Sequence, residues 1–339
     1  PTRRSSDLGD DSMDFNFNLD LGLGTETKTT ELSVNEIYES FIIGGGPAAM
    51  TAAVYLMRKG IKAAIVAGKI GGQVGDTKGI ENYMGYNYIE GDELVSKFSN
   101  QVRQFEIAFK EYVFVENIHL EGDIKVIKLS DGFEYRSKTV IIAAGSKWRQ
   151  LNVPGEEKLR GRGVCYCAIC DGPFFKGLDI AVIGGGNSGV EAALDLSKMV
   201  KSIKVVEFSD KLNADKVLID KMLATPNIES ITSAQVVEVL GDDGVTGLKY
   251  KDRTSGEDKT IDVEGIFVEI GLVPNSQFVD GLVELNKFKE IVINKNCETT
   301  IDGIYACGDI TDVPFKQIII ASGEGAKAAL SACEYLNKH

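Results

Sequence analysis

A strand, a glycine-rich turn and an alanine-rich helix occur twice in this chain, and this repeat constrains the fold more than any other feature. The first turn is Gly44-Gly45-Gly46-Pro47-Ala48-Ala49, and the second, 140 residues later, is Gly184-Gly185-Gly186-Asn187-Ser188-Gly189. Each turn follows a short apolar run, precedes a helical stretch and leads to another apolar run, at 40–43, 50–58 and 63–66 and again at 179–183, 190–199 and 203–206. This order predicts an α/β fold with two Rossmann-like units, each built on a parallel sheet.

The repeated turn also indicates a ligand. One G-x-G-x-x-G pattern is a weak signal, because a glycine turn also forms where a helix merely packs close to a strand. Two copies between a strand and a helix are far more specific. The first glycine turns the chain, the second admits a pyrophosphate, and the third small residue lets the helix pack on the strand. Free N–H groups at the helix N-terminus then bind the pyrophosphate, so we predict two dinucleotide sites.

The two copies differ at the end of their second strand. An acidic residue about 20 positions after a Rossmann turn usually binds the ribose 2′-hydroxyl. Glu207 stands there in the second copy, 21 residues after Gly186, whereas the first copy has Val66-Ala67-Gly68. We therefore expect the second site to take a free 2′-hydroxyl and the first to hold its dinucleotide by other contacts.

The segment Cys167-Ala168-Ile169-Cys170-Asp171 is the third motif, and three interpretations compete for it. A zinc site needs four ligands, but only Cys165 adds a third nearby sulfur, and the chain has just two His residues. An inert pair of cysteines is the second interpretation. We favour a redox disulfide, because C-x-x-C spacing closes a small ring and lowers the pKa of one thiol. Asp171 is then placed to move a proton during thiol exchange.

Two dinucleotide sites and one dithiol together suggest a path for electrons. A nicotinamide gives a hydride, which carries two electrons at once, and a disulfide needs two electrons but does not readily accept a hydride. A flavin connects the two chemistries. We therefore predict FAD in one site and a nicotinamide coenzyme in the other.

Composition narrows the classes of partner and compartment. The net charge of −13 repels phosphate backbones, so we expect no nucleic-acid partner. No apolar run approaches the roughly 18 residues of a membrane span, and no charged-then-apolar signal segment opens the chain. Six cysteines without even spacing predict a reducing compartment, the cytoplasm. Outside the C-x-x-C motif, Cys165 is predicted to be a bystander, and the others to pack as small hydrophobes: Cys297, Cys307 and Cys333.

Residues 1–36 differ from the rest of the chain. They hold eight acidic and three basic residues and no capped periodic run, so we predict a disordered acidic leader. The alternative is a short partner-binding segment that uses Phe15, Phe17, Leu19 and Leu21. Beyond the repeat, residues 303–307 predict a strand and residues 318–336 a helix. Residues 124–129 and 236–250 predict β-hairpins, with turns at Asp131-Gly132 and Asp243-Gly244.

At this point the sequence resembles the low-molecular-weight thioredoxin reductase family, and still more closely the flavoprotein (F) subunit of alkyl hydroperoxide reductase. The resemblance covers roughly residues 37–338. It rests on both glycine turns, on the C-x-x-C-D motif, and on Gly71-Gly72-Gln73, Ile80-Glu81-Asn82-Tyr83, Thr139-Val140-Ile141-Ile142-Ala143-Ala144-Gly145 and Ala306-Cys307-Gly308-Asp309 followed by Lys316-Gln317-Ile318.

The resemblance implies a division into domains and a set of site residues. Residues 37–151 and 275–339 would form the FAD domain, and residues 152–274 an inserted NAD(P) domain that carries the dithiol. The FAD residues implied are Gly44, Gly46, Pro47, Ala48, Ala49, Gly71, Gly72, Gln73, Asn82, Ala144, Gly145, Gly308, Asp309, Lys316, Gln317 and Ile318. The coenzyme residues implied are Gly184, Gly186, Asn187, Ser188, Gly189 and Glu207. The catalytic residues implied are Cys167, Cys170 and Asp171.

The resemblance further implies a homodimer and a rotating NAD(P) domain. The dithiol precedes Gly184 by only 14 residues, so the nicotinamide and the disulfide share one domain and cannot meet the flavin together. We place the hinges near residues 151–154 and 272–275, where the chain crosses between the domains.

Departures from the resemblance shape the functional prediction. The stretch after the second unit's second strand, residues 207–213, begins with an acid and holds no Arg, so we expect NADH rather than NADPH. Only 36 residues precede the FAD unit, and they contain no C-x-x-C, so we expect a separate acceptor, a thioredoxin- or glutaredoxin-like dithiol protein that feeds a peroxiredoxin.

The predicted function is that of a thioredoxin-disulfide reductase. The alternative is the NADH-dependent reductase component for a peroxiredoxin, the alkyl hydroperoxide type. Two further classes are a module that binds FAD and NAD without turnover and a ferredoxin-dependent reductase with a decayed nicotinamide site. The intact dithiol cluster argues against the former class, and the complete second turn with Glu207 argues against the latter.

Overall fold

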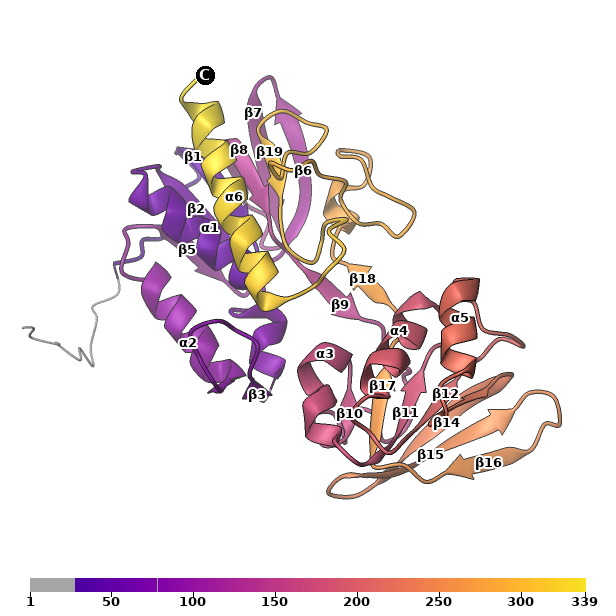
Figure 1. Ribbon diagram of the computed structural model, residues 1–339. Coiled ribbons are helices and arrows are strands. Elements are labelled where there is room, and N and C mark those ends of the chain that lie inside the picture. Colours follow the sequence, from indigo (N-terminus) through magenta and orange to yellow (C-terminus); the bar gives the residue numbers. More distant parts are fainter. Residues whose placement is uncertain (1–27, 78) are drawn as a thin grey trace, which may run out of the picture.

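Two α/β domains joined by a narrow two-stranded connection make up the computed structural model, which describes residues 28–77 and 79–339 (Figure 1). Both contain a parallel sheet with an added antiparallel meander, so the predicted fold class is confirmed. Within the described residues, the helices are all too short or too polar to cross a membrane.

The first domain is built on a seven-stranded sheet. Its strands run in the order β5-β2-β1-β8-β7-β6, with β19 paired to β8. The strands through β8 pair in parallel, whereas β8, β7 and β6 form the meander. The strand bounds are β1 (Ile37–Ile43), β2 (Ala63–Ala67), β5 (Ala108–Glu111), β6 (Val115–Glu121), β7 (Ile124–Leu129), β8 (Glu134–Ile142) and β19 (Ile304–Ala306). The helices are α1 (Pro47–Arg58), α2 (Gly91–Val102) and α6 (Ile318–Leu336), with a short pair β3 (Gly79–Ile80) and β4 (Ile89–Glu90) beside α2.

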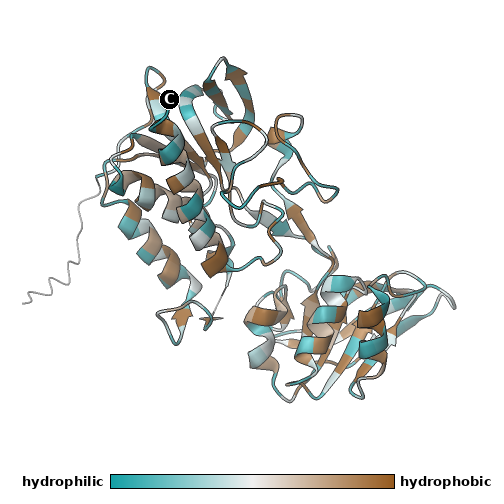
Figure 2. Ribbon diagram, turned by 45° about the horizontal axis from the view of Figure 1, so that its top comes forward, coloured by the Kyte–Doolittle hydropathy of each residue, from teal (hydrophilic) through white to brown (hydrophobic). Residues whose placement is uncertain are grey.

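Small residues bring α1 and α6 together on one face of this sheet. Ala48, Ala49, Ala52 and Ala53 of α1 are buried, and a Cβ on Gly325 of α6 would lie 2.1 Å from the carbonyl oxygen of Ala48. The opposite face packs against the meander and the segment before β19. Figure 2 shows the hydrophobic residues concentrated on the strands and on the inward sides of the helices.

The second domain repeats the plan. Five parallel strands lie in the order β10-β17-β11-β12-β13, and three antiparallel strands, β14-β15-β16, cover one face. The other face packs against α4 and α5. The strand bounds are β10 (Val164–Cys165), β11 (Asp179–Ile183), β12 (Ser202–Val206), β13 (Ile228–Ile231), β14 (Ala234–Gly241), β15 (Val245–Asp252), β16 (Asp258–Ile261) and β17 (Gly265–Val268). The helices are α3 (Ala168–Asp171), α4 (Asn187–Leu196) and α5 (Lys216–Leu223), with a 3₁₀ turn at Gly172–Phe175. Two further 3₁₀ turns, at Gly72–Asp76 and Gln277–Val279, belong to the first domain.

A two-stranded ribbon connects the domains. Strand β9 (Ser146–Trp148) pairs antiparallel with β18 (Leu272–Pro274), and both lie in the gap between the two bodies in Figure 1. The predicted crossing at 272–275 coincides with β18. The other predicted crossing, at 151–154, is wrong, because Leu151 and Val153 pack against the core of the second domain and the chain crosses earlier, at β9.

The prediction of a disordered leader over residues 1–36 is wrong for residues 28–36. The backbone N–H of Thr30 donates to Ile107, and the N–H of Phe109 donates back to Thr30, so this segment adds to the sheet edge beside β5. The side chain of Leu32 packs on the core, and the N–H of Ser33 donates to the Tyr38 hydroxyl at 2.9 Å. Residues 28–36 are therefore part of the folded domain. Residues 1–27, with the predicted Phe15–Leu21 segment, lie outside the described residues.

A truncation pair tests this attachment. A chain that begins at Ile37 loses the three edge hydrogen bonds of residues 28–30, and bonds of this kind stabilise by about 1 kcal/mol each. We expect its melting temperature to fall by several degrees relative to a chain that begins at Lys28, about the shift for 1–3 kcal/mol in a domain of this size. Equal melting temperatures in calorimetry would show that the segment contributes nothing to stability.

Candidate functional site

The two glycine turns adopt the same backbone conformation. Gly46 and Gly186, the residues that precede α1 and α4, both have φ −83° and ψ −175°. Gly44 and Gly184 both take positive φ, +134° and +121°. A Cβ at either position would lie within 2.4 Å of a carbonyl oxygen of a neighbouring strand end, so each requires glycine. The sequence repeat thus corresponds to a structural repeat.

A cavity of about 1050 Å³ begins at the first turn and reaches the second domain. Most of the predicted FAD residues line it, together with the catalytic candidates. The predicted residues in the lining are Gly44, Gly46, Pro47, Ala48, Gly72, Gln73, Asn82, Ala144, Gly145, Cys167, Cys170, Asp171, Gly308, Asp309, Lys316, Gln317 and Ile318. Ala49 and Gly71 lie behind it. Ala49 is buried in the helix–sheet core, and a Cβ on Gly71 would meet the Val95 side chain at 2.3 Å.

The polar side chains of this lining are tied to one another. The Asn82 amide donates to Gln317 Oε1 at 3.2 Å, and the Gln73 amide donates to the Ser146 carbonyl at 2.7 Å. Burial raises the pKa of Asp309, and the nearby Lys316 opposes that rise. These contacts connect Asn82 with Gln317, and Gln73 with the backbone of Ser146, at the wall of the cavity.

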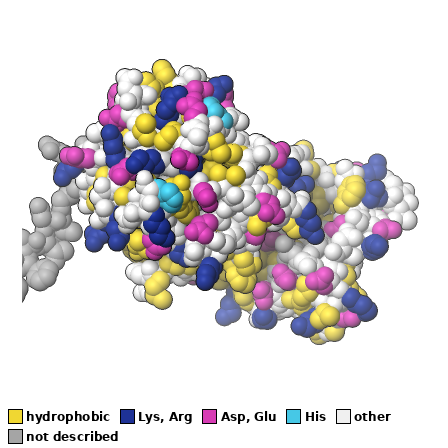
Figure 3. Space-filling model, turned by 90° about the horizontal axis from the view of Figure 1, so that it is seen from above, with side chains coloured by type: hydrophobic (Ala, Val, Ile, Leu, Met, Phe, Trp, Pro, Cys, Tyr) yellow, Lys and Arg dark blue, Asp and Glu magenta, His cyan; other side chains and the backbone are white. Residues whose placement is uncertain are grey.

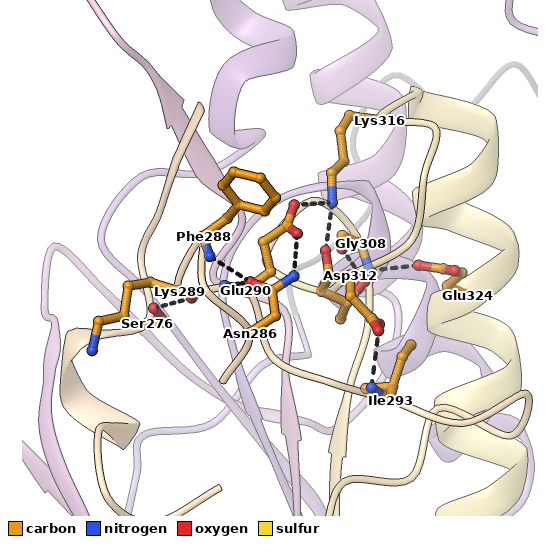
Figure 4. A network of polar contacts seen from close by, with 11 residues as sticks. Ser276, Asn286, Phe288, Lys289, Glu290, Ile293, Gly308, Asp312, Lys316 and Glu324 are labelled. Atoms are coloured by element: carbon orange, nitrogen blue, oxygen red, sulfur yellow. Dashed lines mark hydrogen bonds and ion pairs between the residues drawn. The ribbon is translucent and has the colours of Figure 1, made fainter. Parts of the chain in front are cut away.

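Lys316 plays a structural part that the sequence did not reveal. Its ammonium forms an ion pair with Glu290 at 3.0 Å and donates to the Thr311 carbonyl. Glu290 also accepts from the Asn286 amide at 2.7 Å, and Figure 4 shows this network beside the start of α6. The charge of Lys316 is thus already paired, so it anchors the segment that carries Asp309 and Gln317.

The residues present fit a flavin dinucleotide. Neither α1 nor α6 has a side-chain hydrogen bond at its N-cap, so the first N–H groups of both helices can bind an anionic group such as a pyrophosphate. Ser146, whose Oγ is buried without a partner among the described residues, also lines the cavity. The end of β2 has no acid at the position that corresponds to Glu207, and Lys69, Asp76 and Phe114 line the cavity near it.

The second turn lies at the carboxyl edge of the five-stranded sheet and takes no part in this cavity. Glu207 follows β12 there and is 9% exposed. Its carboxylate accepts from the backbone N–H of Gly185 at 2.6 Å and of Ser209 at 2.8 Å. The Asn187 amide donates to Asp215 at 3.1 Å, and Ser188 is exposed. Glu207 therefore fixes the backbone of the second glycine turn and of the loop after β12.

Arg253 is the residue near this second site that sequence spacing missed. It follows β15, yet its guanidinium lies 3.9 Å from the centroid of the Phe208 ring and donates to the Phe208 carbonyl at 2.8 Å. Residues 207–213 hold no Arg, but the fold brings Arg253 to this stretch from elsewhere in the chain. No pattern near Glu207 could have indicated Arg253, because the antiparallel pairing of β14 with β15 brings the chain back beside the residues that follow β12.

The dithiol motif forms a disulfide at the cavity wall. Cys167 precedes α3 and Cys170 lies within it, with Cα atoms 5.3 Å apart. The backbone N–H of Asp171 donates to the Cys167 carbonyl at 3.0 Å. Two of the three sulfurs that a zinc site would use are joined in this disulfide, so they are not available as thiolate ligands. Cys297, Cys307 and Cys333 are buried as predicted, with their thiol pKa values raised by burial.

Two carboxyl groups beside the disulfide have raised pKa values. Burial raises the pKa of Asp171 to about 6, although a hydrogen bond from the Cys165 thiol lowers it. Burial also raises the pKa of Glu269 to about 7, and the negative charge of Asp171 adds to that rise. The backbone N–H of Ala168 opposes it. Cys165 is thus a partner of Asp171 rather than a bystander, and Glu269 is a second acid that sequence spacing did not indicate.

Comparisons with known proteins identify the family of this chain. The chain matches the family described as pyridine nucleotide-disulphide oxidoreductase over residues 38–325. It is 48% identical over 309 residues to the F subunit of alkyl hydroperoxide reductase of Xanthomonas campestris pv. phaseoli, covering 90% of this chain and 58% of that protein. The chain therefore spans about three fifths of the length of this relative.

Solved structures show the same architecture. Thioredoxin reductase from Streptococcus pyogenes is 38% identical, with a TM-score of 0.85 and coverage of 90% of this chain and all of that one. Lactococcus lactis thioredoxin reductase, described as an FR conformation, is also 38% identical but has a TM-score of 0.62, with coverage of 89% and 100%. With its two Rossmann-like domains and its disulfide at the cavity wall, the chain belongs to the pyridine nucleotide-disulphide oxidoreductase family, a family of enzymes.

Proposed function

We propose that this chain passes two electrons from NADH through FAD to the Cys167–Cys170 disulfide, and from there to a thioredoxin-like protein or domain. One observation carries the proposal: the disulfide lines the same cavity as the first glycine turn and Gln317. A second candidate acceptor is a peroxiredoxin, favoured by the 48% identity to the F subunit of an alkyl hydroperoxide reductase. A cytoplasmic location and a homodimer stay predictions, the latter checked by light scattering.

The cofactor would be held by the backbone of both helix starts. Gly44, Gly46 and the first turn of α1 would bind its pyrophosphate, while Asp309 and Gln317 would face the ribityl chain and ring. Bound FAD supplies the ability to accept two electrons from a nicotinamide and to release them to a disulfide. Gly184, Gly186, Gly189 and Glu207 would hold NADH, with the Glu207 carboxylate accepting from the ribose hydroxyls.

The two cysteines and Asp171 would carry the exchange. Two electrons break the S–S bond, and Asp171 protonates the released thiolate, which leaves one thiol and one thiolate. The thiolate attacks the disulfide of the acceptor, and the second cysteine then displaces the acceptor and re-forms the Cys167–Cys170 bond. In total, NADH, one proton and one protein disulfide give NAD⁺ and a protein dithiol.

The coenzyme and the disulfide would use the cavity in turn. The second glycine turn lies outside the cavity in the arrangement described. Reduction of FAD by NADH therefore requires a second arrangement of the domains, which rotation of the inserted domain about β9 and β18 would produce. The two thioredoxin reductases support this, because their equal identity of 38% comes with TM-scores of 0.85 and 0.62. Such a difference is expected when the same domains are arranged differently.

An anaerobic titration tests the proposed function. NADH should bleach the yellow enzyme, and oxidised thioredoxin should then restore the colour. A peroxiredoxin in place of thioredoxin separates the two acceptors. Bleaching that neither acceptor reverses would reject the proposal.

The pKa of Asp171 predicts how dithiol formation depends on pH. The acid form donates the proton, so the rate should fall as the pH rises above about 6. The protonated fraction of a carboxyl with that pKa falls about 15-fold between pH 6 and pH 7.5. Stopped-flow traces of the enzyme reduced in single turnover would report the rate. Asp171→Asn should be slower and flat with pH, whereas Asp195→Asn, an exposed change on α4, should follow the wild type. A rate that rises across this window would contradict the role of Asp171.

A further inference from the structure

Glu156 is a buried carboxylate that the proposed chemistry does not use. It is 3% exposed, and its two oxygens accept three hydrogen bonds. The backbone N–H of Leu151 donates to Oε1 at 2.8 Å, the N–H of Asn152 donates to Oε2 at 2.7 Å, and the hydroxyl of Tyr166 donates to Oε1 at 2.8 Å. A buried charge persists only when such donors surround it, so this arrangement is specific.

Two of these bonds hold the chain where it leaves the interdomain ribbon. The ribbon ends with the backbone bond from Arg149 to Gly271, and Asn152, three residues later, has a φ of +56°. This left-handed conformation is uncommon for residues other than glycine. Immediately afterwards, the Pro154 carbonyl accepts from Val239 of β14 at 2.9 Å. The chain is therefore fixed to the second domain from Leu151 onward, and only Gln150 separates the last ribbon bond from that anchor.

The third bond reaches the residue next to the dithiol. Tyr166 directly precedes Cys167, and its ring stacks on Trp148 of β9 with centroids 6.3 Å apart. The Arg160 guanidinium lies 5.3 Å from the centroid of the Tyr166 ring. Burial and the Glu156 hydrogen bond raise the pKa of the Tyr166 phenol well above its usual value, so it stays a donor. Glu156 thus connects the ribbon exit with the start of the dithiol segment.

We propose that Glu156 is the positioning residue that makes the dithiol follow the ribbon. It joins Leu151, Asn152 and Tyr166 into one unit directly after the ribbon, so the dithiol keeps a fixed place relative to the ribbon when the domain rotates. This inference rests on the rotation proposed above. It assigns Glu156 no contact with the reacting atoms.

Three variants test the connection. Glu156→Gln keeps the shape but replaces one acceptor oxygen with an NH₂ donor, so it cannot accept from both backbone amides. Tyr166→Phe removes only the third bond. Glu157→Gln is the matched control, because this neighbouring carboxylate is 78% exposed and lies 3.9 Å from Arg160. Hydrogen exchange of the holoenzyme should be about tenfold faster across residues 151–152 in Glu156→Gln and unchanged in Glu157→Gln.

A second readout uses the chain's single tryptophan, Trp148, which lines the cavity and contacts Tyr166. Its fluorescence lifetime should change in Glu156→Gln and in Tyr166→Phe but not in the control. Neither readout depends on disulfide reduction, so failure of the proposed function would leave both interpretable.

In turnover, Glu156→Gln should slow dithiol formation about threefold to tenfold without changing the Kd for NADH. Unchanged exchange at 151–152, or an equal effect of Glu157→Gln, would overturn the proposal. If Glu156→Gln fails to fold, an unchanged Trp148 lifetime in Tyr166→Phe would overturn it.

Discussion

Cys167→Ser and Cys170→Ser are each expected to abolish reduction of a protein disulfide while NADH still bleaches the flavin. The two cysteines form the disulfide at the cavity wall, and a single thiol cannot both attack an acceptor and resolve the mixed disulfide. We expect turnover with thioredoxin to fall at least about 1000-fold, which corresponds to about 4 kcal/mol. Reduction of the cofactor precedes this exchange, so its rate should stay close to that of the wild type.

The measurement needs both readouts on the same variants. Steady-state reduction of thioredoxin reports the exchange, and anaerobic stopped-flow absorbance after mixing with NADH reports the earlier step. Cys333→Ser is the control, because this cysteine is buried on α6 and does not line the cavity. If either dithiol variant retained more than about a tenth of wild-type turnover, a loss under ~1.4 kcal/mol, the pair would not be the relay.

The second large effect concerns coenzyme choice at Glu207. Its carboxylate should accept hydrogen bonds from the adenosine ribose hydroxyls of NADH. A hydrogen bond to a charged acceptor contributes about 1.5–3 kcal/mol of binding free energy. NADPH would bring a phosphate of about two negative charges to that position. We therefore expect NADPH to be disfavoured by about 30- to 1000-fold in kcat/KM, or about 2–4 kcal/mol.

The structure shows one residue that could oppose this preference for NADH. The guanidinium of Arg253 lies close to the residues that follow Glu207, but it already contacts the Phe208 ring and carbonyl. If Arg253 instead swung to the phosphate, the two coenzymes would be used about equally. Arg253→Ala distinguishes these cases, because it should leave the NADH preference intact if the guanidinium stays on Phe208.

Kinetics with both coenzymes should be measured on the wild type, on Arg253→Ala and on three further variants. Glu207→Gln keeps the shape of a residue that also braces Gly185 and Ser209, and it should reduce the preference for NADH. Glu207→Arg should shift it toward NADPH. Glu229→Arg is the control, because it makes the same charge change on β13, where Glu229 pairs with Lys204 instead of bracing the turn. Equal kcat/KM for the two coenzymes in the wild type would refute the prediction.

The surface around the folded body carries charges of both signs, as Figure 3 shows for one face. Ion pairs such as Lys198 with Asp195 and Lys216 with Asp220 are exposed, so they contribute little to stability because water and salt screen them. The control changes at Asp195, Glu157 and Glu229 are placed among exposed pairs of this kind, so we expect each of them to leave the fold intact.

Local backbone chemistry accounts for the parts of this protein that could be predicted from its sequence. Gly44 and Gly184 need positive φ and a close approach to a carbonyl, and only glycine meets both conditions, so the two turns and the strands and helices around them could be predicted. The helix at Ile318–Leu336 and the strand β11 were predicted with their observed bounds. The C-x-x-C disulfide likewise depends on residues three apart in the chain.

Features that depend on residues far apart in sequence emerged only in the folded chain. Arg253 reaches Phe208, Glu269 reaches Asp171, and Thr30 reaches Ile107, and no spacing rule connects these pairs. The attachment of residues 28–36 and the position of the first crossing strand were predicted incorrectly for the same reason. A short polar segment joins a sheet edge, or an apolar pair such as Leu151 and Val153 joins one core instead of the other, only when a complementary surface is already folded beside it. The free energy of such a contact depends on both segments, so it cannot be predicted from the residue pattern of one segment alone.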